Sequence, residues 1–438
     1  MPVNELQVTD KRTGSTYTVP IHHNAIRASD VAEIEALDGL LPKGLRILDE
    51  ALEHIAPQTS RVTFLDADSG ILYYRGYEVA TILGKKSFEE TCYCLIWGQF
   101  PSLSEAARFR RELLLEGRKA PKLVIDTIQN IPRTAPAITM FQVGISAMLA
   151  TQGSTIPAFV GKELYWKNIP AVDSAIVRTL ASAQAILTTI YCHRQGRPLT
   201  EPDPDPNCSF TYNLLRAFGI VDESTQKPTS KFVSWIDRCL LIYADHEMSC
   251  ATFAFLVTAS AHTDPLSCYL SAISTAYGMI HGGALDAAYR MLERVGSPEN
   301  VPNLLAAVKR REELLYGFGH RIYKTRDPRA KMFLDILMEV QEETGKKDPL
   351  LAVAQEVDRL ASQDPFFQQR GIHINPDLYA CFSCTAMGIP QDMVCLFLFF
   401  SRLQGFLAHW REFAADPHRI IRPTQIYVGD IGKRLHKL

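Results

Sequence analysis

The chain has 438 residues, of which 47% are hydrophobic and 21% are charged, and its formal net charge is -2. This composition is typical of a globular protein long enough for two or three domains. A pI near 6.6 gives the chain no general attraction to nucleic acid or to an anionic membrane, so we expect neither as a partner. The ten cysteines show no framework spacing. Cys381 and Cys384, although spaced as C-x-x-C, are expected to be buried thiols in a reducing compartment.

The two ends of the sequence carry little targeting information. The first six residues include an early acid and no apolar core, which predicts neither a secretory signal nor a transit peptide. The longest apolar run, 393–400, is too short to span a membrane before Arg402 interrupts it. The last three residues, His436-Lys-Leu438, are a loose variant of the peroxisomal address Ser-Lys-Leu. We therefore expect a cytoplasmic protein, with a peroxisomal location as the alternative.

Helical periodicity dominates the chain after a short strand or half-hairpin predicted at 13–20. Residues 102–105 form a capping box that opens a helix ending at Gly117, and the acidic proline stretch 201–206 predicts a surface loop. Neither a βαβ alternation nor a repeat period is visible, so we expect a mainly α protein. Further helices are predicted over 123–150, 172–191, 228–262 (a buried pair), 332–345 and 350–361, and one opened by Asn375, Pro376 and Asp377 and closed by Gly388.

The stretch 315–331 is the most informative part of the sequence. Gly317 and Gly319 flank an aromatic residue and predict a tight backbone, after which come His320, Arg321 and a helix start. Lysines and arginines outnumber acids by eight to three between Lys309 and Lys331. In a neutral chain this local excess favours a small anionic ligand, although a solvated basic loop would have the same composition.

Four other places carry chemically useful groups. His246 lies between two acids in the buried helix pair, and His281 precedes two glycines that would allow a ligand to approach it. Either could equally be an ordinary histidine of the fold. Asp377, at the start of its helix, could stabilise the helix dipole or act as a general base. Arg402 follows the apolar run, so it needs a carboxylate or a bound anion as its partner, whereas Arg422 in the C-terminal arm has a surface salt bridge as its simplest role.

Three histidines, one carboxylate and several arginines without metal-ligand spacing suit carbanion chemistry on a polyanionic substrate. Arginines would hold carboxylates, a carboxylate would remove a C–H proton, and histidines would stabilise an enolate oxygen and polarise a carbonyl. Nine separated segments form a pattern that follows one family in order: 72–77, 87–90, 244–247, 281–284, 316–321, 327–329, 375–377, 408–410 and 422–427. On these segments the chain resembles citrate synthases along nearly its whole length.

The resemblance implies a role for each matching residue. Asp377 would remove the α-proton of an acyl-CoA while His281 hydrogen-bonds the thioester oxygen, and His320 would polarise the ketone of oxaloacetate. The residues expected to bind oxaloacetate are His246, Arg329, Arg402 and Arg422, the last reaching over from the partner subunit of a homodimer. Those expected near CoA are Gly317, Gly319 and Lys324.

The resemblance also implies an almost entirely α-helical, two-domain fold with the site in the cleft between domains. The large domain would comprise 1–279 and 391–438 and the small domain 280–390. Domain closure would exclude water from the site. Oxaloacetate and the CoA thioester would be substrates, and neither a metal nor another cofactor would be required.

Departures from the family pattern fall on the acyl-binding side. Ser249 and Leu285 stand where the family commonly has asparagine, and Met279-Ile280 replaces Pro-Leu. Pro376 replaces a valine, and Ala380-Cys381 replaces Ser-Gly. Apolar or flexible neighbours would suit a longer acyl chain, because each additional buried CH2 contributes about 0.8 kcal/mol. The residues expected to form the acyl pocket are Ser249, Met279 and Leu285.

The sequence therefore predicts an alkylcitrate synthase, of the kind found in fungal secondary metabolism, that takes a medium-chain acyl-CoA. The alternative is a housekeeping citrate or 2-methylcitrate synthase that uses acetyl-CoA or propionyl-CoA. Two further hypotheses come from other classes. A metal-dependent hydrolase could use His246, Glu247, His281 and His320, but no suitable ligand spacing supports it. A non-catalytic helical scaffold would not require the acid–base residues.

Overall fold

The computed structural model describes residues 4–37, 44–117, 121–416 and 419–431. It divides into two compact units with the boundary between Thr59 and Ser60. The boundaries predicted from the family resemblance, at 279/280 and 390/391, both fall inside the second unit. These boundaries describe which helices would move together when the two predicted domains close, and they stay a prediction.

The first unit contains a β-hairpin and one short helix. β1 (Glu5–Thr9) pairs in antiparallel register with β2 (Thr16–Pro20), and α1 (Ala28–Val31) follows. Thr9 lies opposite Thr16, and the two side-chain hydroxyls are 3.1 Å apart. The strand or half-hairpin predicted at 13–20 is confirmed, since 16–20 forms the second strand of the hairpin.

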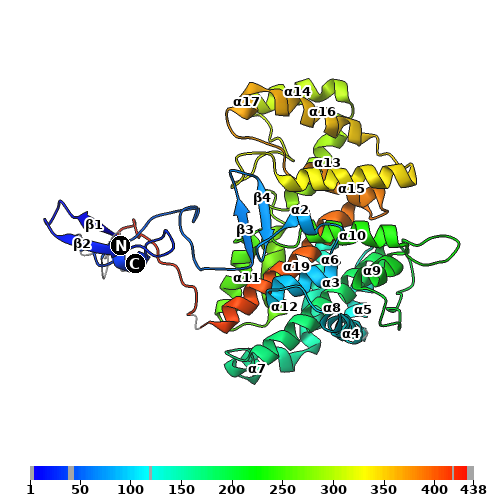
Figure 1. Ribbon diagram of the computed structural model, residues 1–438, viewed down its shortest axis with the longest axis horizontal. Coiled ribbons are helices and arrows are strands. Elements are labelled where there is room, and N and C mark those ends of the chain that lie inside the picture. The colour runs from blue at the N-terminus through cyan, green and yellow to red at the C-terminus, as the bar shows by residue number, and fades with distance from the viewer. Residues whose placement is uncertain (1–3, 38–43, 118–120, 417–418, 432–438) are drawn as a thin grey trace, which may run out of the picture. The chain divides into compact units, whose positions relative to one another are not determined.

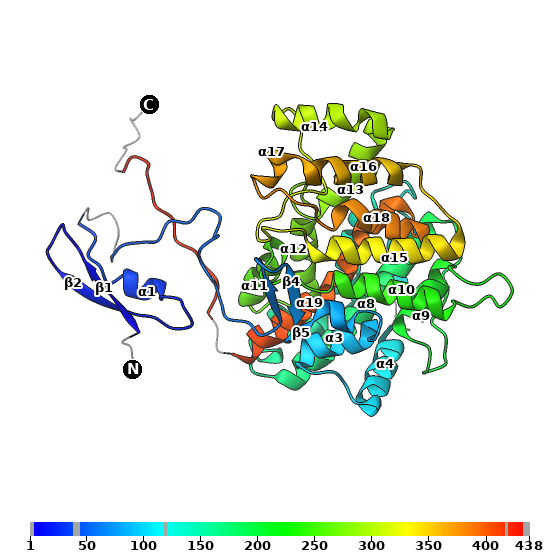
Figure 2. The ribbon, with the colours of Figure 1, turned by 45° about the horizontal axis from the view of Figure 1, so that its top comes forward.

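The second unit is a body of α-helices with one small antiparallel sheet (Figures 1 and 2). Its sheet has the order β3-β4-β5, with β3 (Thr63–Asp66), β4 (Ile71–Tyr74) and β5 (Tyr77–Glu78). The helices before the first predicted site residue are α2 (Val79–Ile82), α3 (Phe88–Trp97), α4 (Leu103–Gly117), α5 (Lys122–Gln129), α6 (Ala137–Thr151), α7 (Pro157–Val160), α8 (Ile169–Arg194), α9 (Phe210–Phe218) and α10 (Ser230–Ile242). The helices after it are α11 (Cys250–Ser260), α12 (Pro265–Ala276), α13 (Gly283–Val295), α14 (Val301–Lys309), α15 (Pro328–Thr344), α16 (Leu350–Gln363), α17 (Pro365–Gln368), α18 (Asp377–Ala386) and α19 (Gln391–Ala415).

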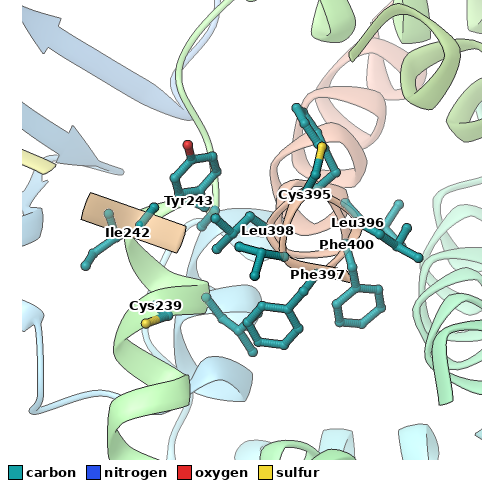
Figure 3. Close-up of a cluster of buried hydrophobic side chains, with 14 of the residues drawn as sticks. Cys239, Ile242, Tyr243, Cys395, Leu396, Phe397, Leu398 and Phe400 are labelled. Carbon is teal, nitrogen blue, oxygen red and sulfur yellow. The ribbon is translucent and has the colours of Figure 1, made fainter. Parts of the chain in front are cut away.

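The core is built around two long apolar helices, α8 and α19. By length and composition both could cross a membrane, but 89% and 100% of their apolar windows are buried inside the protein. Phe400 of α19 stacks on Phe88 of α3, and Phe397 packs edge-to-face against Phe218 of α9. Figure 3 shows Leu398 on the side of α19 that faces Ile242 and Tyr243 at the end of α10. The burial of these α19 side chains explains why the run 393–400 is so apolar: it is the centre of a helical core.

Local sequence signals predicted most helix ends correctly. The Ser102 hydroxyl accepts the Glu105 amide at 3.4 Å and the Glu105 carboxylate accepts the Ser102 amide at 2.8 Å, which is the predicted capping box. Gly345 ends α15 in the left-handed conformation, as predicted. The segment 201–206 contains neither helix nor strand, whereas 123–150 forms two helices separated by a break at 130–136.

The thiols of the C-x-x-C segment lie inside the core. Cys381 and Cys384 are both buried on α18, and all ten cysteines are free. Burial raises the pKa of the Cys381 thiol, and a hydrogen bond with Cys239 followed by burial raises that of Cys384, which keeps both thiols protonated and unreactive. The expectation of small buried thiols is confirmed.

Candidate active site

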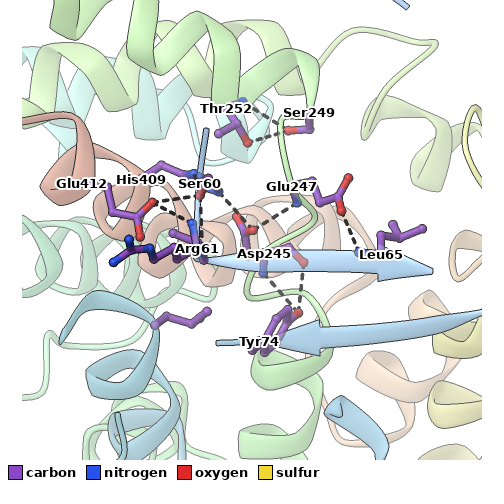
Figure 4. Close-up of polar contacts among 12 residues, drawn as sticks. Ser60, Arg61, Leu65, Tyr74, Asp245, Glu247, Ser249, Thr252, His409 and Glu412 are labelled. Atoms are coloured by element: carbon purple, nitrogen blue, oxygen red, sulfur yellow. Dashed lines mark hydrogen bonds and ion pairs between the residues drawn. The ribbon is translucent and has the colours of Figure 1, made fainter. Parts of the chain in front are cut away.

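The turn between α10 and α11 carries Asp245 and His246. Asp245 is fully buried, and its Oδ2 lies 3.2 Å from His409 Nε2 on α19. The hydroxyl of Tyr74, on β4, donates to the Asp245 carbonyl at 3.0 Å and accepts from the Asp245 amide at 3.2 Å (Figure 4). These contacts anchor the turn to both a strand and a helix, so they fix the backbone from which the His246 side chain projects.

The next residue of this turn is held in a strained conformation. Glu247 has φ 54°, the left-handed region that non-glycine residues seldom occupy. Its amide donates to Asp245 Oδ2 at 3.1 Å, and its Oε1 accepts the Leu65 amide of β3 at 2.6 Å. The carboxylate of Glu247 therefore secures the turn, which is a structural role and not that of a hydrolytic base.

His281 lies in the tight turn between α12 and α13. A side chain at the position of Gly282 would overlap Phe399, with a Cβ-to-ring distance of 1.7 Å, and one at Gly283 would lie 2.5 Å from the Tyr277 carbonyl. The two glycines are therefore required by the close approach of α19 and of the preceding turn. This packing holds the imidazole of His281 6.1 Å from the Phe399 ring, centroid to centroid.

The stretch 315–320 is tied to the segment before α18. Gly317 and Gly319 have φ values of 82° and 87°, as expected for a tight backbone. The Gly319 amide donates to the His373 carbonyl at 2.7 Å, and the Asn375 amide donates to the Gly317 carbonyl at 2.9 Å. This pairing brings His320 and the start of α18 together, although more than fifty residues separate them in sequence.

Asp377 is the first residue of α18. The helix therefore begins two residues after Asn375, and Pro376 occupies the N-cap position, whereas the sequence predicted Asn375 as the N-cap. The amide of Asp377 still donates to Asn375 Oδ1, at 3.0 Å. A carboxylate at a helix N-terminus favours the helix dipole. Its Oδ1 also accepts the hydroxyl of Tyr243, at 2.7 Å.

His320 is held as a neutral hydrogen-bond donor. Its Nδ1 accepts the amides of Ile322 and Tyr323, at 3.1 and 3.2 Å. Because Nδ1 accepts, the ring proton must be on Nε2. The His320 ring packs edge-to-face on His246, with centroids 5.0 Å apart, so two of the predicted histidines share one site.

The two buried arginines differ in their partners. Arg329 is held by Asp327 through two contacts, Nε to Oδ1 at 3.0 Å and Nη2 to Oδ2 at 2.7 Å. Arg402 is 6% exposed, its Nε has no hydrogen-bond partner, and it forms no ion pair within the described ranges. Both guanidinium groups lie over the ring of Tyr243, at 5.8 and 5.7 Å from its centroid. Arg402 is therefore the buried cation of the two that is free to bind an incoming anion.

Burial shifts the pKa of the groups expected to do acid–base chemistry. Desolvation raises the pKa of Asp377 to about 6, within reach of a general base that works near neutral pH. Desolvation lowers the pKa of His281 and of His320 to about 4, and the nearby cation Arg402 acts in the same direction on both. The pKa of His246 is also well below the ordinary value, through burial and then the charge of Arg329. The three imidazoles are neutral at physiological pH.

Unpartnered polar atoms gather where these residues meet. His246 Nε2, the Tyr323 hydroxyl and Arg402 Nε are buried and have no hydrogen-bond partner within the described residues. The rings of His246 and Tyr323 are 5.7 Å apart, centroid to centroid. Buried polar atoms without partners are destabilising, and Arg402 and Tyr323 contribute donors to this cluster, which indicates a site built for an oxygen-rich ligand.

His246, His320 and Asp327 also come close enough to suggest a metal site, with potential ligand atoms within 4.8 Å of one another. Their donor atoms do not suit a cation. Both oxygens of Asp327 are engaged by the guanidinium of Arg329, and Nδ1 of His320 already accepts two amides. A cation there would have to compete with an arginine that is fixed in place.

Two predicted binding residues lie on the surface. Lys324 Nζ is 3.4 Å from Asp68 Oδ1, and both side chains are exposed. Arg422 is exposed in the segment 419–431, which contains neither helix nor strand, and no contact in the described part of the chain joins it to the cluster. The predicted roles of Lys324 at CoA and of Arg422 in a partner's site stay predictions.

The three residues predicted to form the acyl pocket have different surroundings. Ser249 caps α11, and its hydroxyl accepts the Thr252 amide at 3.2 Å. Leu285 is buried in the core on α13, whereas Met279 is 61% exposed in the turn before His281. Its neighbour Ile280 is 94% exposed. Met279 and Ile280 are thus the apolar side chains available to a ligand beside His281, and the acyl pocket as a whole stays a prediction.

Tyr243, Asp327 and Tyr323 belong to the cluster and were not identified from the sequence. Tyr243 follows the buried helix α10, and its position in an apolar run could have signalled a hydroxyl in need of a partner. Asp327 was assigned no role, although its spacing from Arg329 allows the N-terminal contact seen here. None of their partners could be named without the fold.

Comparison with known proteins identifies the family of the chain. Residues 51–424 match the family model described as citrate synthase, C-terminal domain. A citrate synthase-like protein from Aspergillus oryzae, oryE, is 41% identical over 437 residues, which cover 98% of this chain and 97% of that protein. The alkylcitrate synthase phiJ of a fungal species is 34% identical over 98% of this chain and 94% of its own length.

Solved structures show the same architecture. The citrate synthase of Thermoplasma acidophilum, in a ternary complex with carboxymethyl coenzyme A and oxaloacetate, superimposes with a TM-score of 0.80 at 26% identity. The match covers 89% of this chain and 98% of that one. The predicted mainly α fold is confirmed. The chain belongs to the citrate synthase family, whose members are transferases that condense an acyl-CoA with oxaloacetate.

Proposed function

We propose that this protein is an alkylcitrate synthase that condenses a medium-chain acyl-CoA with oxaloacetate and water, releasing free CoA. The observation that carries the proposal is the group of buried, unpartnered donors around Arg402, next to a carboxylate with a raised pKa. A dicarboxylate with a ketone presents the acceptors that these donors lack. The carboxylate of Asp377 can act as the general base that removes a proton from carbon.

The chemistry begins with proton removal. The carboxylate of Asp377 takes a proton from the α-carbon of the acyl-CoA, while the imidazole of His281 donates a hydrogen bond to the thioester oxygen as it gains negative charge. A neutral imidazole still carries one N–H that it can donate, and the lowered pKa of His281 keeps the ring neutral. The product of this step is an enol or enolate nucleophile.

Carbon–carbon bond formation follows at the ketone of oxaloacetate. His320 Nε2–H donates to the ketone oxygen, and the enolate carbon attacks the ketone carbon, which becomes the tertiary alkoxide or alcohol. Arg402, Arg329 and His246 bind the carboxylates of oxaloacetate and set the angle of attack. Water then hydrolyses the thioester and releases CoA.

The exposed apolar pair Met279 and Ile280 supports a substrate with an acyl tail. Large apolar side chains at 61% and 94% exposure, directly before the catalytic His281, are unfavourable in water. An acyl chain that covers them would gain about 0.8 kcal/mol for each buried CH2. The alkylcitrate synthase among the similar proteins is consistent with this preference.

A panel of acyl-CoA thioesters tests the preference. We expect kcat/KM to rise from acetyl- and propionyl-CoA to hexanoyl- or octanoyl-CoA. Met279→Ser should reduce kcat/KM for octanoyl-CoA about threefold to tenfold and leave acetyl-CoA nearly unchanged, because it removes about 1 kcal/mol of apolar contact. Met338→Ser is the matched control, since Met338 is similarly exposed on α15. A clear preference for acetyl- or propionyl-CoA would favour a housekeeping citrate or 2-methylcitrate synthase.

The pH profile tests the base. Because the pKa of Asp377 is raised to about 6, kcat/KM should rise as the pH increases through 6 and fall about tenfold per unit below it. His281 and His320 have a pKa of about 4, so they should add no second step between pH 5 and 8. Measuring kcat/KM from pH 4.5 to 8.5 checks this. An acid limb centred near pH 4, the ordinary value for a carboxyl, would contradict the assignment.

Cofactor, assembly and location are part of the same proposal. The reaction needs neither a metal nor a redox cofactor, because proton transfer and carbonyl polarisation are supplied by side chains. We propose a homodimer in which Arg422 completes the site of the partner. A cytoplasmic location is proposed, with the peroxisome as the alternative; the signal considered for it, His436-Lys-Leu438, lies outside the described residues.

A further inference from the structure

Tyr243 contacts the proposed base Asp377 and also both buried arginines, although the proposed steps give it no role. It follows α10, is 6% exposed, and its hydroxyl donates to Asp377 Oδ1 at 2.7 Å. Figure 3 shows its hydroxyl directed away from the apolar side chains of α19. Its ring lies beneath the guanidinium groups of Arg329 and Arg402, at 5.8 and 5.7 Å from the centroid.

Packing against the ring of Tyr243 and the hydrogen bond of its hydroxyl together hold this side chain in one orientation. Phe333 of α15 packs edge-to-face against it, with centroids 5.7 Å apart, and the cations occupy positions over the ring. The hydroxyl is therefore delivered to Asp377 from a fixed direction. One carboxylate oxygen is engaged, which leaves Oδ2 to receive a proton.

We propose that Tyr243 is a positioning residue that holds Asp377 in the orientation and the ionised state required for proton abstraction. The inference rests on the proposed function, since it assigns a task within that same reaction. Tyr243 does not touch the reacting atoms and acts through the carboxylate.

The charge state of Asp377 depends on every group that faces it. Burial raises its pKa, and the Tyr243 hydroxyl lowers it by donating to the charged form. Arg329 and Arg402 lower it further, while Asp327, which caps α15, raises it. Cys395 of α19 is a neighbour whose own thiol pKa is raised by burial, so it stays uncharged. Of these groups, Tyr243 alone donates a hydrogen bond to the carboxylate among the contacts of the described residues.

Tyr243 itself remains a donor at any working pH. Burial raises the pKa of its hydroxyl well above the ordinary tyrosine value, and the negative charge of Asp377 raises it further. A phenol that cannot ionise is a permanent donor to the carboxylate. Removing it leaves a buried carboxylate without that hydrogen bond, and the protonated form becomes more favourable.

The test is Tyr243→Phe, which removes only the hydroxyl. The acid limb of kcat/KM should move up by about one pH unit, since one hydrogen bond to a charged group corresponds to roughly that shift. At the pH optimum, where Asp377 is ionised in both proteins, kcat should fall about tenfold because the carboxylate is no longer held in one orientation, while KM for oxaloacetate stays within about twofold because the ring still supports both arginines. With α-deuterated acyl-CoA, the primary isotope effect on kcat should increase, because proton abstraction becomes more rate-limiting.

Tyr269→Phe is the matched control. Tyr269 is fully buried, and its hydroxyl donates to the Phe399 carbonyl at 3.3 Å, so the variant also removes one buried phenolic hydrogen bond. It should leave the acid limb and the isotope effect unchanged. If wild-type protein condenses an acyl-CoA and Tyr243→Phe shares the acid limb and isotope effect of wild type, the inference is wrong and the proposed function stands. Wild-type protein that condenses no acyl-CoA with oxaloacetate would overturn both.

Discussion

Asp377→Asn should lower kcat for CoA release by about 10²- to 10⁴-fold, the usual contribution of a positioned general base. The amide keeps the shape of the side chain and can still accept the Tyr243 hydroxyl, but it cannot take a proton from carbon. The measurement is steady-state release of CoA at saturating oxaloacetate, alongside thermal unfolding to establish that the fold is retained.

A matched control separates this effect from a general loss of charge. Asp335, on the exposed face of α15, pairs with Lys331 at 2.7 Å. Asp335→Asn should leave kcat within about twofold of wild type, since exposed pairs contribute little. If Asp377→Asn kept more than about a tenth of wild-type kcat, Asp377 would not be the base.

We expect the second large effect from Arg402→Met, which should weaken the binding of oxaloacetate without destabilising the fold. KM for oxaloacetate should rise about 10- to 100-fold, from the loss of a charge-assisted hydrogen bond to a substrate carboxylate. The free energy of unfolding should stay the same or increase by up to about 4 kcal/mol, because replacing a buried, unpaired ion by an apolar side chain removes a desolvation penalty. Burial already lowers the pKa of this guanidinium, which reports the same penalty. Steady-state kinetics and chemical denaturation measure the two quantities.

Arg329→Met provides the contrast. It should also raise KM for oxaloacetate, but it leaves Asp327 buried and unpaired, which costs about 3–5 kcal/mol. The two variants should therefore differ in their free energy of unfolding as well as in their kinetics. A loss of stability in Arg402→Met as large as that in Arg329→Met would mean that Arg402 supports the fold and is not held in readiness for an anion.

Local chemistry explains which elements the sequence could predict. The capping box of Ser102 and Glu105 and the glycine end at Gly345 depend on neighbours within a few residues, and both were found as expected. The interval 123–150 was predicted as continuously helical, and its break at 130–136 contains Pro132 and Pro136, a local signal that was overlooked. The start of α18 differed for a long-range reason, since the pairing of 317–319 with 373–375 fixes the chain just before it.

The same distinction applies to the site: motifs indicate which residues take part, but not which residues contact one another. The types and order of His246, His281, His320 and Asp377 could be predicted from motifs. Their partners could not, because the contact from Tyr243 to Asp377 spans 134 positions in sequence.

The sequence left open whether a protein carboxylate or a bound anion balances Arg402. Within the described residues Arg402 forms no ion pair, which favours the bound anion.

The most direct test of the central claim is the release of CoA by purified protein with and without oxaloacetate, with the product identified by mass. We predict that release from hexanoyl- or octanoyl-CoA requires oxaloacetate. The expected product has the combined mass of the free fatty acid and oxaloacetic acid, with one CoA released for each product molecule. Release of CoA at the same rate without oxaloacetate, giving the free fatty acid, would show a thioesterase and contradict the account.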